Sequence, residues 1–169
     1  AAIVTVPHVA SAEPAGGVTS GTTNKMGLIA AGDGFTCAIV NGGQVACWGR
    51  GNSGSMGDGN FVDRAYMQLV SGISTATQIA AGSTHVCAVL TDTTVKCWGT
   101  NTYGQLGNGT QVSQAAPVAV CAAAGCAASL TGVVQVSTGT DHSCAVMSGG
   151  TVKCWGRGTN NRLGAAVGD

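Results

Sequence analysis

The sequence predicts an all-β fold that is built from three consecutive repeats. Two observations carry this prediction: a cysteine-centred pattern recurs three times, and the composition is typical of short strands joined by tight turns. The 169 residues include 28 glycines but only 3 prolines, and 44% of them are hydrophobic while 8% are charged. Disordered chains show the opposite balance, so we expect a folded core.

Each repeat contains two apolar runs of strand type, separated by a polar turn. The first run carries Cys37, Cys87 or Cys144, which are spaced by 50 and then 57 residues. The second run carries Cys-Trp-Gly and places another cysteine ten residues after the first. The paired runs are 29–40 with 45–49, 79–90 with 95–99, and 136–147 with 152–156. The repeats therefore predict three equivalent β-hairpins.

A disulfide is expected across each hairpin. The turns Asn-Gly-Gly (41–43), Thr-Asp-Thr (91–93) and Ser-Gly-Gly (148–150) contain residue types that accept tight-turn geometry. Folding about these turns places the two cysteines directly opposite each other, at disulfide range. The predicted pairs are Cys37 with Cys47, Cys87 with Cys97, and Cys144 with Cys154. Zinc ligation is the less favoured alternative, because zinc sites usually hold cysteines two to four residues apart at a turn.

The extra seven residues of the second interval coincide with a fourth cysteine pair, Cys121 and Cys126. We expect this pair to staple a surface insertion. Since disulfides persist in oxidising surroundings, the cysteines predict a secreted protein, extracellular or at the cell surface. The apolar start at 1–6 is typical of a mature end that remains after removal of a signal segment.

Charge and hydropathy disfavour two classes of partner. Seven basic and seven acidic residues cancel, and the basic ones are scattered along the chain. Nucleic acid calls for clustered positive charge, so we expect no nucleic-acid partner. No apolar stretch approaches the roughly 20 residues that a membrane-spanning helix needs.

No catalytic residue, metal site or cofactor is predicted, and the chain is not expected to be an enzyme. Asp141, His142 and Ser143 are the residue types of a hydrolase triad, but neighbouring strand residues point to opposite faces. The run 58–60 with Asp63 matches a calcium loop only loosely, so a plain turn is favoured.

These motifs resemble the regulator of chromosome condensation repeat family, in its cysteine-bearing bacterial version. The resemblance spans residues 29–164. It rests on Gly-x-x-His-x-Cys-Ala at 82–88 and 139–145, on the Cys-Trp-Gly runs, and on the loop Asn-Thr-Tyr-Gly-Gln-Leu-Gly at 101–107. The first repeat departs from this pattern by carrying Phe35 at the histidine position. The tryptophans follow the bridge cysteines, so packing between repeats is favoured over a row of ligand-stacking rings.

The resemblance implies a β-propeller, in which each repeat forms a four-stranded blade and usually seven blades close a ring. This chain would then be a partial β-propeller of three four-stranded blades, each with a cross-strand disulfide hairpin. The expected division is an N-terminal strand and linker at 1–28, a first blade at 29–78, a second at 79–135 and a truncated third at 136–169.

The two ends of this arc are expected to be complementary. Apolar strands follow Gly57 and Gly107, whereas only five residues follow Gly164, and the segment 3–10 is a surplus apolar strand. Open blade faces need a cover. We expect the surplus strand of one copy to complete the open end of another, head to tail, which gives a ring or a filament. The predicted subunit-interface residues are Ile3, Val4, Val6, Val9 and Leu163.

The function predicted first is that of a secreted, self-assembling structural protein, such as the subunit of an extracellular filament or surface appendage. Its partner would be other copies of itself. Two alternatives stay open: a secreted propeller module that binds other surface proteins or glycans, and a fragment of a longer seven-bladed propeller.

Overall fold

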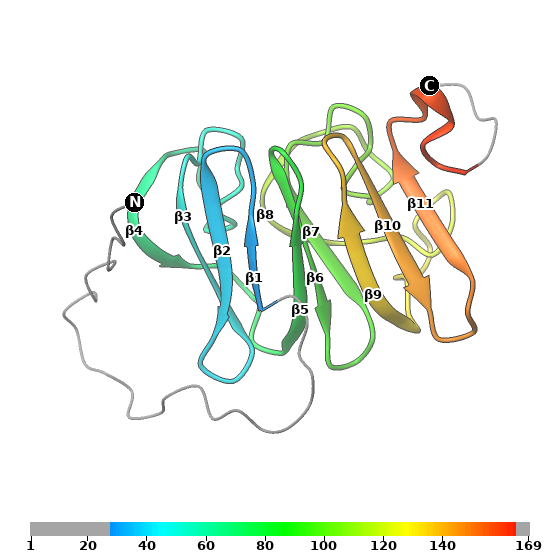
Figure 1. Cartoon of the computed structure of the whole chain (residues 1–169), viewed down its shortest axis with the longest axis horizontal. Coiled ribbons are helices and arrows are strands. Elements are labelled where there is room, and N and C mark those ends of the chain that lie inside the picture. The colour runs from blue at the N-terminus through cyan, green and yellow to red at the C-terminus, as the bar shows by residue number, and fades with distance from the viewer. Residues whose placement is uncertain (1–27, 165–169) are drawn as a thin grey trace, which may run out of the picture.

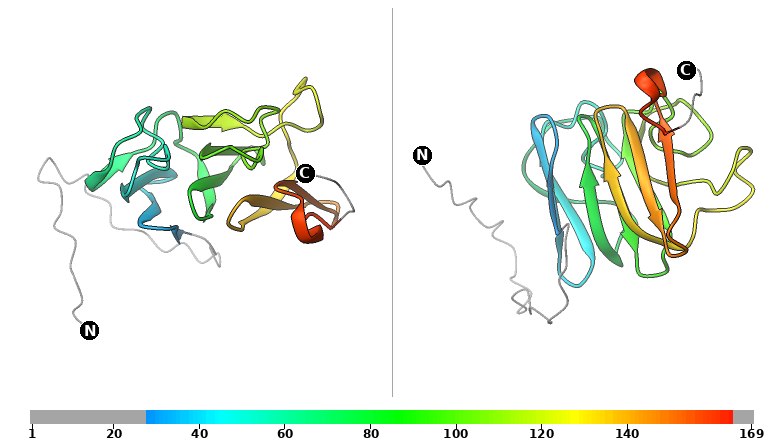
Figure 2. Two further views of the ribbon diagram at one scale, coloured as in Figure 1. Left: turned by 90° about the horizontal axis from the view of Figure 1, so that it is seen from above. Right: turned by 45° about the vertical axis from the view of Figure 1, so that its right-hand side comes forward.

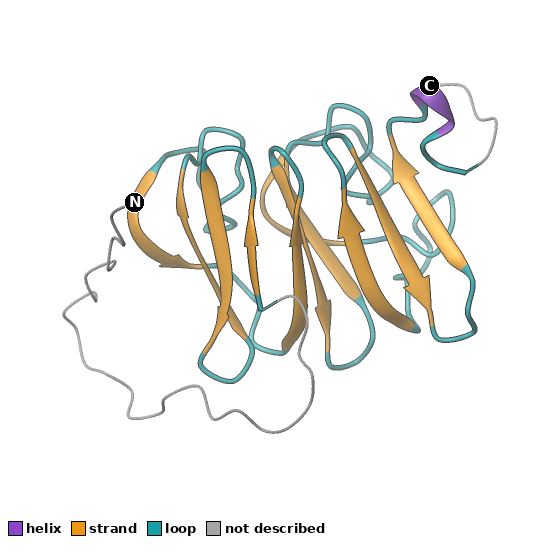
Figure 3. Cartoon of the chain, in the orientation of Figure 1, coloured by secondary structure: helices purple, strands orange, loops and turns teal. Residues whose placement is uncertain are grey.

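The computed structural model describes residues 28–164, which form three antiparallel sheets standing side by side in sequence order (Figure 1). The predicted interface residues Ile3, Val4, Val6 and Val9 lie outside the described residues. Strands account for almost all of the regular structure, as Figure 3 shows. The predicted all-β, partial-propeller fold is confirmed.

Each sheet is a meander in which every strand pairs with the next one along the chain. The first sheet holds β1 (Ile29–Ala31), β2 (Phe35–Val40), β3 (Gln44–Gly49) and β4 (Arg64–Leu69). The second holds β5 (Ala76–Ala81), β6 (His85–Leu90), β7 (Val95–Gly99) and β8 (Gln114–Ala119). The third, within the described residues, holds three strands: β9 (Val133–Thr138), β10 (His142–Met147) and β11 (Val152–Gly156). A short 3-10 helix, η1 (Thr159–Asn161), follows β11.

Two strands begin earlier than the repeat alignment indicated. β5 starts at Ala76 and β9 at Val133, each three residues before the expected blade boundaries at 79 and 136. The reason is pairing at the far ends of the hairpins, where Ala76 lies opposite Leu90 and Val133 opposite Met147. The repeat motif begins inside the strand, so it marks the strand's presence better than its start.

The central hairpins carry the disulfides. Cys37 lies opposite Cys47 in register, and the equivalent pairs are Cys87 with Cys97 and Cys144 with Cys154. All three pairs are bonded, with Cα–Cα distances of 4.1, 4.1 and 4.0 Å. Cys121 is bonded to Cys126 in the exposed segment after β8.

The glycine of Cys-Trp-Gly is required by close packing of the hairpin. Gly99 has φ +106°, and a Cβ there would overlap the main-chain carbonyl of Thr84 on the facing strand. Gly49 and Gly156 have φ +105° and +106° and meet their facing strands in the same way. The repeated glycine therefore lets each hairpin close beyond its disulfide.

Two apolar clusters fill the spaces between consecutive sheets. The first joins Phe35 and Cys37 of β2 to Val86, Ala88 and Trp98 of the second sheet, together with other buried residues. The second joins Cys87, Val89 and Val95 to Ala145 and the partly buried Trp155. Strand alternation explains both clusters, because one face of the second sheet packs on the first sheet and its other face packs on the third.

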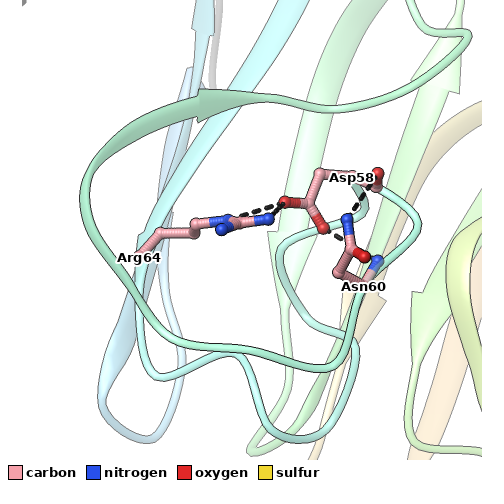
Figure 4. Close-up of polar contacts among 3 residues, drawn as sticks. All are labelled: Asp58, Asn60 and Arg64. Carbon is pink, nitrogen blue, oxygen red and sulfur yellow. Dashed lines mark hydrogen bonds and ion pairs between the residues drawn. The ribbon is translucent and has the colours of Figure 1, made fainter.

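The loop after β3 is held by an ion pair. Arg64 contacts the Asp58 carboxylate at 2.5 Å, and the main-chain N–H of Asn60 donates to the same carboxyl group at 3.0 Å (Figure 4). Asp58 thus closes a turn and neutralises Arg64. Among residues 28–164 no group of three or more His, Cys, Asp or Glu residues could hold a metal ion. The absence of a metal site stays a prediction.

Candidate functional site

The junctions between consecutive sheets define how one repeat recognises the next. The Trp98 indole N–H donates to the main-chain carbonyl of Ser55 at 2.9 Å. The Trp155 indole makes the same bond to Gln105, also at 2.9 Å. Ser55 and Gln105 are equivalent positions, each seven residues after its own repeat's tryptophan. Each tryptophan is therefore anchored in the loop of the preceding repeat, which confirms the packing interpretation for Trp98 and Trp155.

A buried histidine and serine form a second contact between the last two sheets. The Ser143 hydroxyl donates to the Gln105 carbonyl at 3.0 Å, and His85 Nε2 lies 3.0 Å from the same hydroxyl. Because the serine proton points to the carbonyl, Nε2 of His85 must carry the hydrogen. Burial lowers the pKa of His85 from 6.5 to about 4, so the ring is neutral at pH 7.

This pair does not have the arrangement of a catalytic dyad. His85 and Ser143 are both 0% exposed, and among residues 28–164 Nδ1 of His85 has no hydrogen-bond partner to orient the ring. The run 141–143 is not a triad either: Ser143 faces the second sheet, while Asp141 pairs with Arg157 at 3.4 Å. The arrangement joins two sheets rather than activating a nucleophile.

The equivalent positions at the first junction are both apolar. Phe35 replaces the histidine and Val86 replaces the serine, and both are buried in the same cluster. Thus an apolar ring meets an apolar side chain at one junction, and a histidine meets a hydroxyl at the other. Sequence reasoning noted Phe35 as a departure from the repeat but missed its partner, because the partner lies one repeat away.

The two outermost sheets expose positions that are buried inside the stack. Ile29 on the first sheet is 65% exposed, whereas its equivalents Ile79 and Val136 are both 2% exposed. On the third sheet Val152 is 62% exposed, while its equivalents at the internal junctions are 0% exposed. The predicted interface residue Leu163 is partly buried, and its equivalents Met56 and Leu106 are fully buried. Both ends thus present sheet-packing faces that have no neighbour among the described residues.

A groove lies along the outer edge of β11. β4 pairs with β3 and β8 with β7, on the same side of the row of sheets (Figure 2), whereas no described strand pairs with the outer edge of β11. The groove there has a volume of about 790 Å³. Its walls include Gly104 and Gly109 of the second repeat's loop and the β11 residues Lys153, Cys154 and Trp155.

The first junction shows what normally fills this place. There the N–H of Gly59 donates to the carbonyl of Ala115 on β8 at 2.9 Å, and Gly54 also approaches that strand closely. Gly104 and Gly109, the equivalents of Gly54 and Gly59, line the groove, and the Cys121–Cys126 disulfide lies against Gly109. The groove therefore lies where a fourth strand would pair with β11, and residues 121–124 of the disulfide-stapled segment form part of its wall.

Comparison with known families gives the same repeat architecture. One model of the regulator of chromosome condensation (RCC1) repeat matches residues 42–89 and 94–146, and a second matches 28–55, 76–105 and 133–162. The chain belongs to the RCC1 repeat family. No curated protein matches the chain significantly.

Solved RCC1-type structures share the fold. Prp20p from Saccharomyces cerevisiae, described with its binding to Gsp1p and histones, aligns with a TM-score of 0.66 at 24% identity, over 83% of this chain and 34% of its own length. Human WBSCR16 aligns with a TM-score of 0.67 at 23% identity, over 83% and 36%. Yeast RCC1 (Prp20) bound to Kap60 gives 0.67 and 23%, over 83% and 34%. This chain spans about a third of the length of these proteins.

Proposed function

We propose that this chain is a self-assembling structural protein that works outside the cell, as the subunit of a filament or surface appendage. The observation that carries the proposal is the groove along the outer edge of β11, with which no strand among residues 28–164 pairs. A strand added there would form main-chain hydrogen bonds to an unpaired sheet edge, which is a common mode of protein association.

The segment 3–10 is the proposed occupant of the groove. It is apolar and contains Pro7. Proline removes one main-chain donor, so it is confined largely to edge strands. The outer strand of the second sheet, β8, also carries a proline, Pro117, at an edge. The composition of the segment therefore fits an outermost strand.

A second copy, rather than the same one, is proposed to donate the strand. A segment folding back within one chain would fill the groove but leave Ile29 and Val152 in solvent. Stacking of a second copy covers both faces and donates the strand at the same junction. Such a contact is head-to-tail, and its repetition gives either a closed ring or an open filament.

The disulfides support the extracellular setting. Residues 28–164 contain four disulfide bonds, and such bonds persist where thiols are not kept reduced. Between residues 28 and 164 no helix is long and apolar enough to cross a membrane. A non-enzymatic role remains a prediction.

A second candidate function is binding of a different protein. The loop before β4 and the strand itself expose several large apolar side chains, with Phe61 at 51%, Tyr66 at 63% and Leu69 at 48%. Large exposed apolar patches often mark interaction sites. Prp20p, which shares the fold, binds Gsp1p and histones. Pull-down with the native chain and with a Tyr66→Ser, Leu69→Ser variant tests this candidate. A protein that binds through these side chains is captured by the native chain but not by the variant.

The assembly proposal is tested by sedimentation of the full chain with its disulfides intact. Val4→Asp with Val6→Asp places two charges in the donated segment, and we expect the dissociation constant of the assembly to rise at least tenfold. The matched control is Ser11→Asp with Ala12→Asp, which adds the same charge just outside that segment. Equal association of the two variants would contradict strand donation.

A further inference from the structure

The free face of the first sheet carries a hydroxyl and an indole side by side. Thr36 lies opposite Trp48 in the hairpin register. The equivalent pairs are Val86 with Trp98 and Ser143 with Trp155, and both of these pairs face the preceding sheet. Thr36 and Trp48 therefore face the side on which the described residues provide no preceding sheet. Within the described residues, the Trp48 indole has no hydrogen-bond acceptor.

The free face of the third sheet carries the matching groups. His142 is equivalent to His85, whose ring points to the next sheet. Between residues 28 and 164 the His142 ring makes no hydrogen bond, and its Nδ1 is buried. Arg162 is equivalent to Ser55 and Gln105, whose main-chain carbonyls accept the tryptophan bonds.

The loop around Arg162 keeps the acceptor geometry although its sequence has diverged. Gly164 N–H donates to Asn161 at 3.0 Å, just as Gly57 donates to Gly54 at 3.1 Å and Gly107 to Gly104 at 2.9 Å. Asn161 has φ +56°, so it takes the left-handed conformation that glycine takes in the other two loops. The Arg162 carbonyl thus occupies the position in its turn that corresponds to the Ser55 and Gln105 carbonyls, which accept the tryptophan hydrogen bonds.

We infer that the first sheet of one copy stacks on the third sheet of the next copy, with the Thr36 hydroxyl against His142 and the Trp48 indole against the Arg162 carbonyl. The inference rests on the proposed self-assembly and names the residues of its junction. It repeats the internal contacts, in which His85 meets a hydroxyl and Trp155 meets a loop carbonyl. Ile29 and Val152 would then be buried, as their equivalents are.

The pairing of side-chain types argues for a second copy as the neighbour. Inside the chain, Phe35 is matched by Val86 and His85 by Ser143. A mismatch would bury a polar group without a hydrogen-bond partner, which is unfavourable. The free histidine, His142, and the free hydroxyl, Thr36, are of matched types. The third sheet therefore offers the histidine, and the first sheet the hydroxyl, of a junction like the one between His85 and Ser143.

Two single substitutions and their mixture test the inference. Thr36→Val leaves His142 without a hydroxyl, and His142→Phe leaves Thr36 without a histidine, so each variant alone should associate at least tenfold more weakly than the native chain. In an equal mixture, Phe at 142 of one variant meets Val at 36 of the other, as Phe35 meets Val86. The remaining junction in the mixture is native. The mixture should therefore assemble as alternating copies, with near-native affinity.

The double variant Thr36→Val with His142→Phe should also assemble, because every junction between its copies pairs the new phenylalanine with the new valine. Trp48→Phe should weaken association about tenfold without lowering the stability of the separate chain, because its indole has no acceptor there. Sedimentation velocity reads association, and circular dichroism confirms that each variant folds. Equal association of the native chain and all variants would overturn the inference while leaving self-assembly intact. A native chain that never associates would overturn the proposed function itself.

Discussion

At the scale of single residues, the junctions between sheets depend on a few polar groups that have no freedom to relax. His85 is fully buried and holds Ser143, which in turn holds the loop carbonyl of Gln105. The chain of three groups requires that Nε2 carries a hydrogen. Protonation of the other ring nitrogen, Nδ1, would add a buried positive charge and a donor that has no hydrogen-bond partner among residues 28–164. Protonation of His85 is therefore the first event expected to loosen the second junction.

Stability should fall with acidification between pH 6.5 and about 4. Burial lowers the pKa of His85 to about 4, outweighing the nearby Asp141 charge that raises it, and His142 adds a smaller lowering effect. The unfolded chain binds this proton at higher pH than the folded chain does. The stabilisation is therefore complete above pH 6.5 and is lost as pH falls through this window, by at most about 3 kcal/mol. Denaturant unfolding at pH 7.5, 5.5 and 4.5 measures it.

The matched control is His85→Phe with Ser143→Val, which copies the Phe35 and Val86 pair of the first junction. This variant keeps every other titrating group, so the difference between its pH profile and the native one isolates His85. An unchanged profile would show that another group causes the acid sensitivity.

The hydrogen bonds between neighbouring sheets could not be predicted from the sequence. His85 and Ser143 are 58 residues apart, and the partner of each tryptophan is a main-chain carbonyl, which has no side-chain signature. Alignment of the three repeats offered one signal, since Phe35 and Val86 differ from the later repeats in a correlated way. Only the stacking of the sheets shows that the correlation joins one repeat to the next.

At the scale of elements, the hairpins were predictable because their information is local. The spacing of Cys37 and Cys47 on either side of the hairpin turn fixes the register of the two strands. The structure has the equivalent register in all three repeats. Strand starts were less predictable. Ala76 and Val133 extend β5 and β9 because of partners at the far end of the next strand, and a repeat motif does not encode that pairing.

Gly99→Ala should strongly destabilise the second hairpin. The substitution forces an alanine into φ +106° and drives its Cβ into the carbonyl of Thr84. We expect the free energy of unfolding to fall by about 2 kcal/mol or more, because positive φ and overlap both penalise a side chain. Gly149→Ala is the control: no atom lies within 4 Å of its Cβ and its φ is not positive. Thermal unfolding that ranks both variants with the native chain would contradict this account of Cys-Trp-Gly.

At the scale of the whole molecule, the three sheets form an arc whose two ends repeat its internal surfaces. The propeller architecture was predictable from the resemblance of the repeats, and it is confirmed. The shape of the groove along β11 was not, because it depends on how the second repeat's loop stands beside the third sheet. In the proposed head-to-tail assembly, two copies would contribute six sheets to a closed ring, and an assembly that does not close would run on as a fibre.

The central claim is that copies of this chain associate head to tail, and the native mass of the full chain with intact disulfides tests it most directly. Native mass spectrometry over a wide concentration range, followed by electron microscopy of the same sample, gives the size and the form. We predict a closed dimer of twice 16.5 kDa or fibres built from this chain alone. A well-folded species that stays at 16.5 kDa at every concentration would contradict the claim.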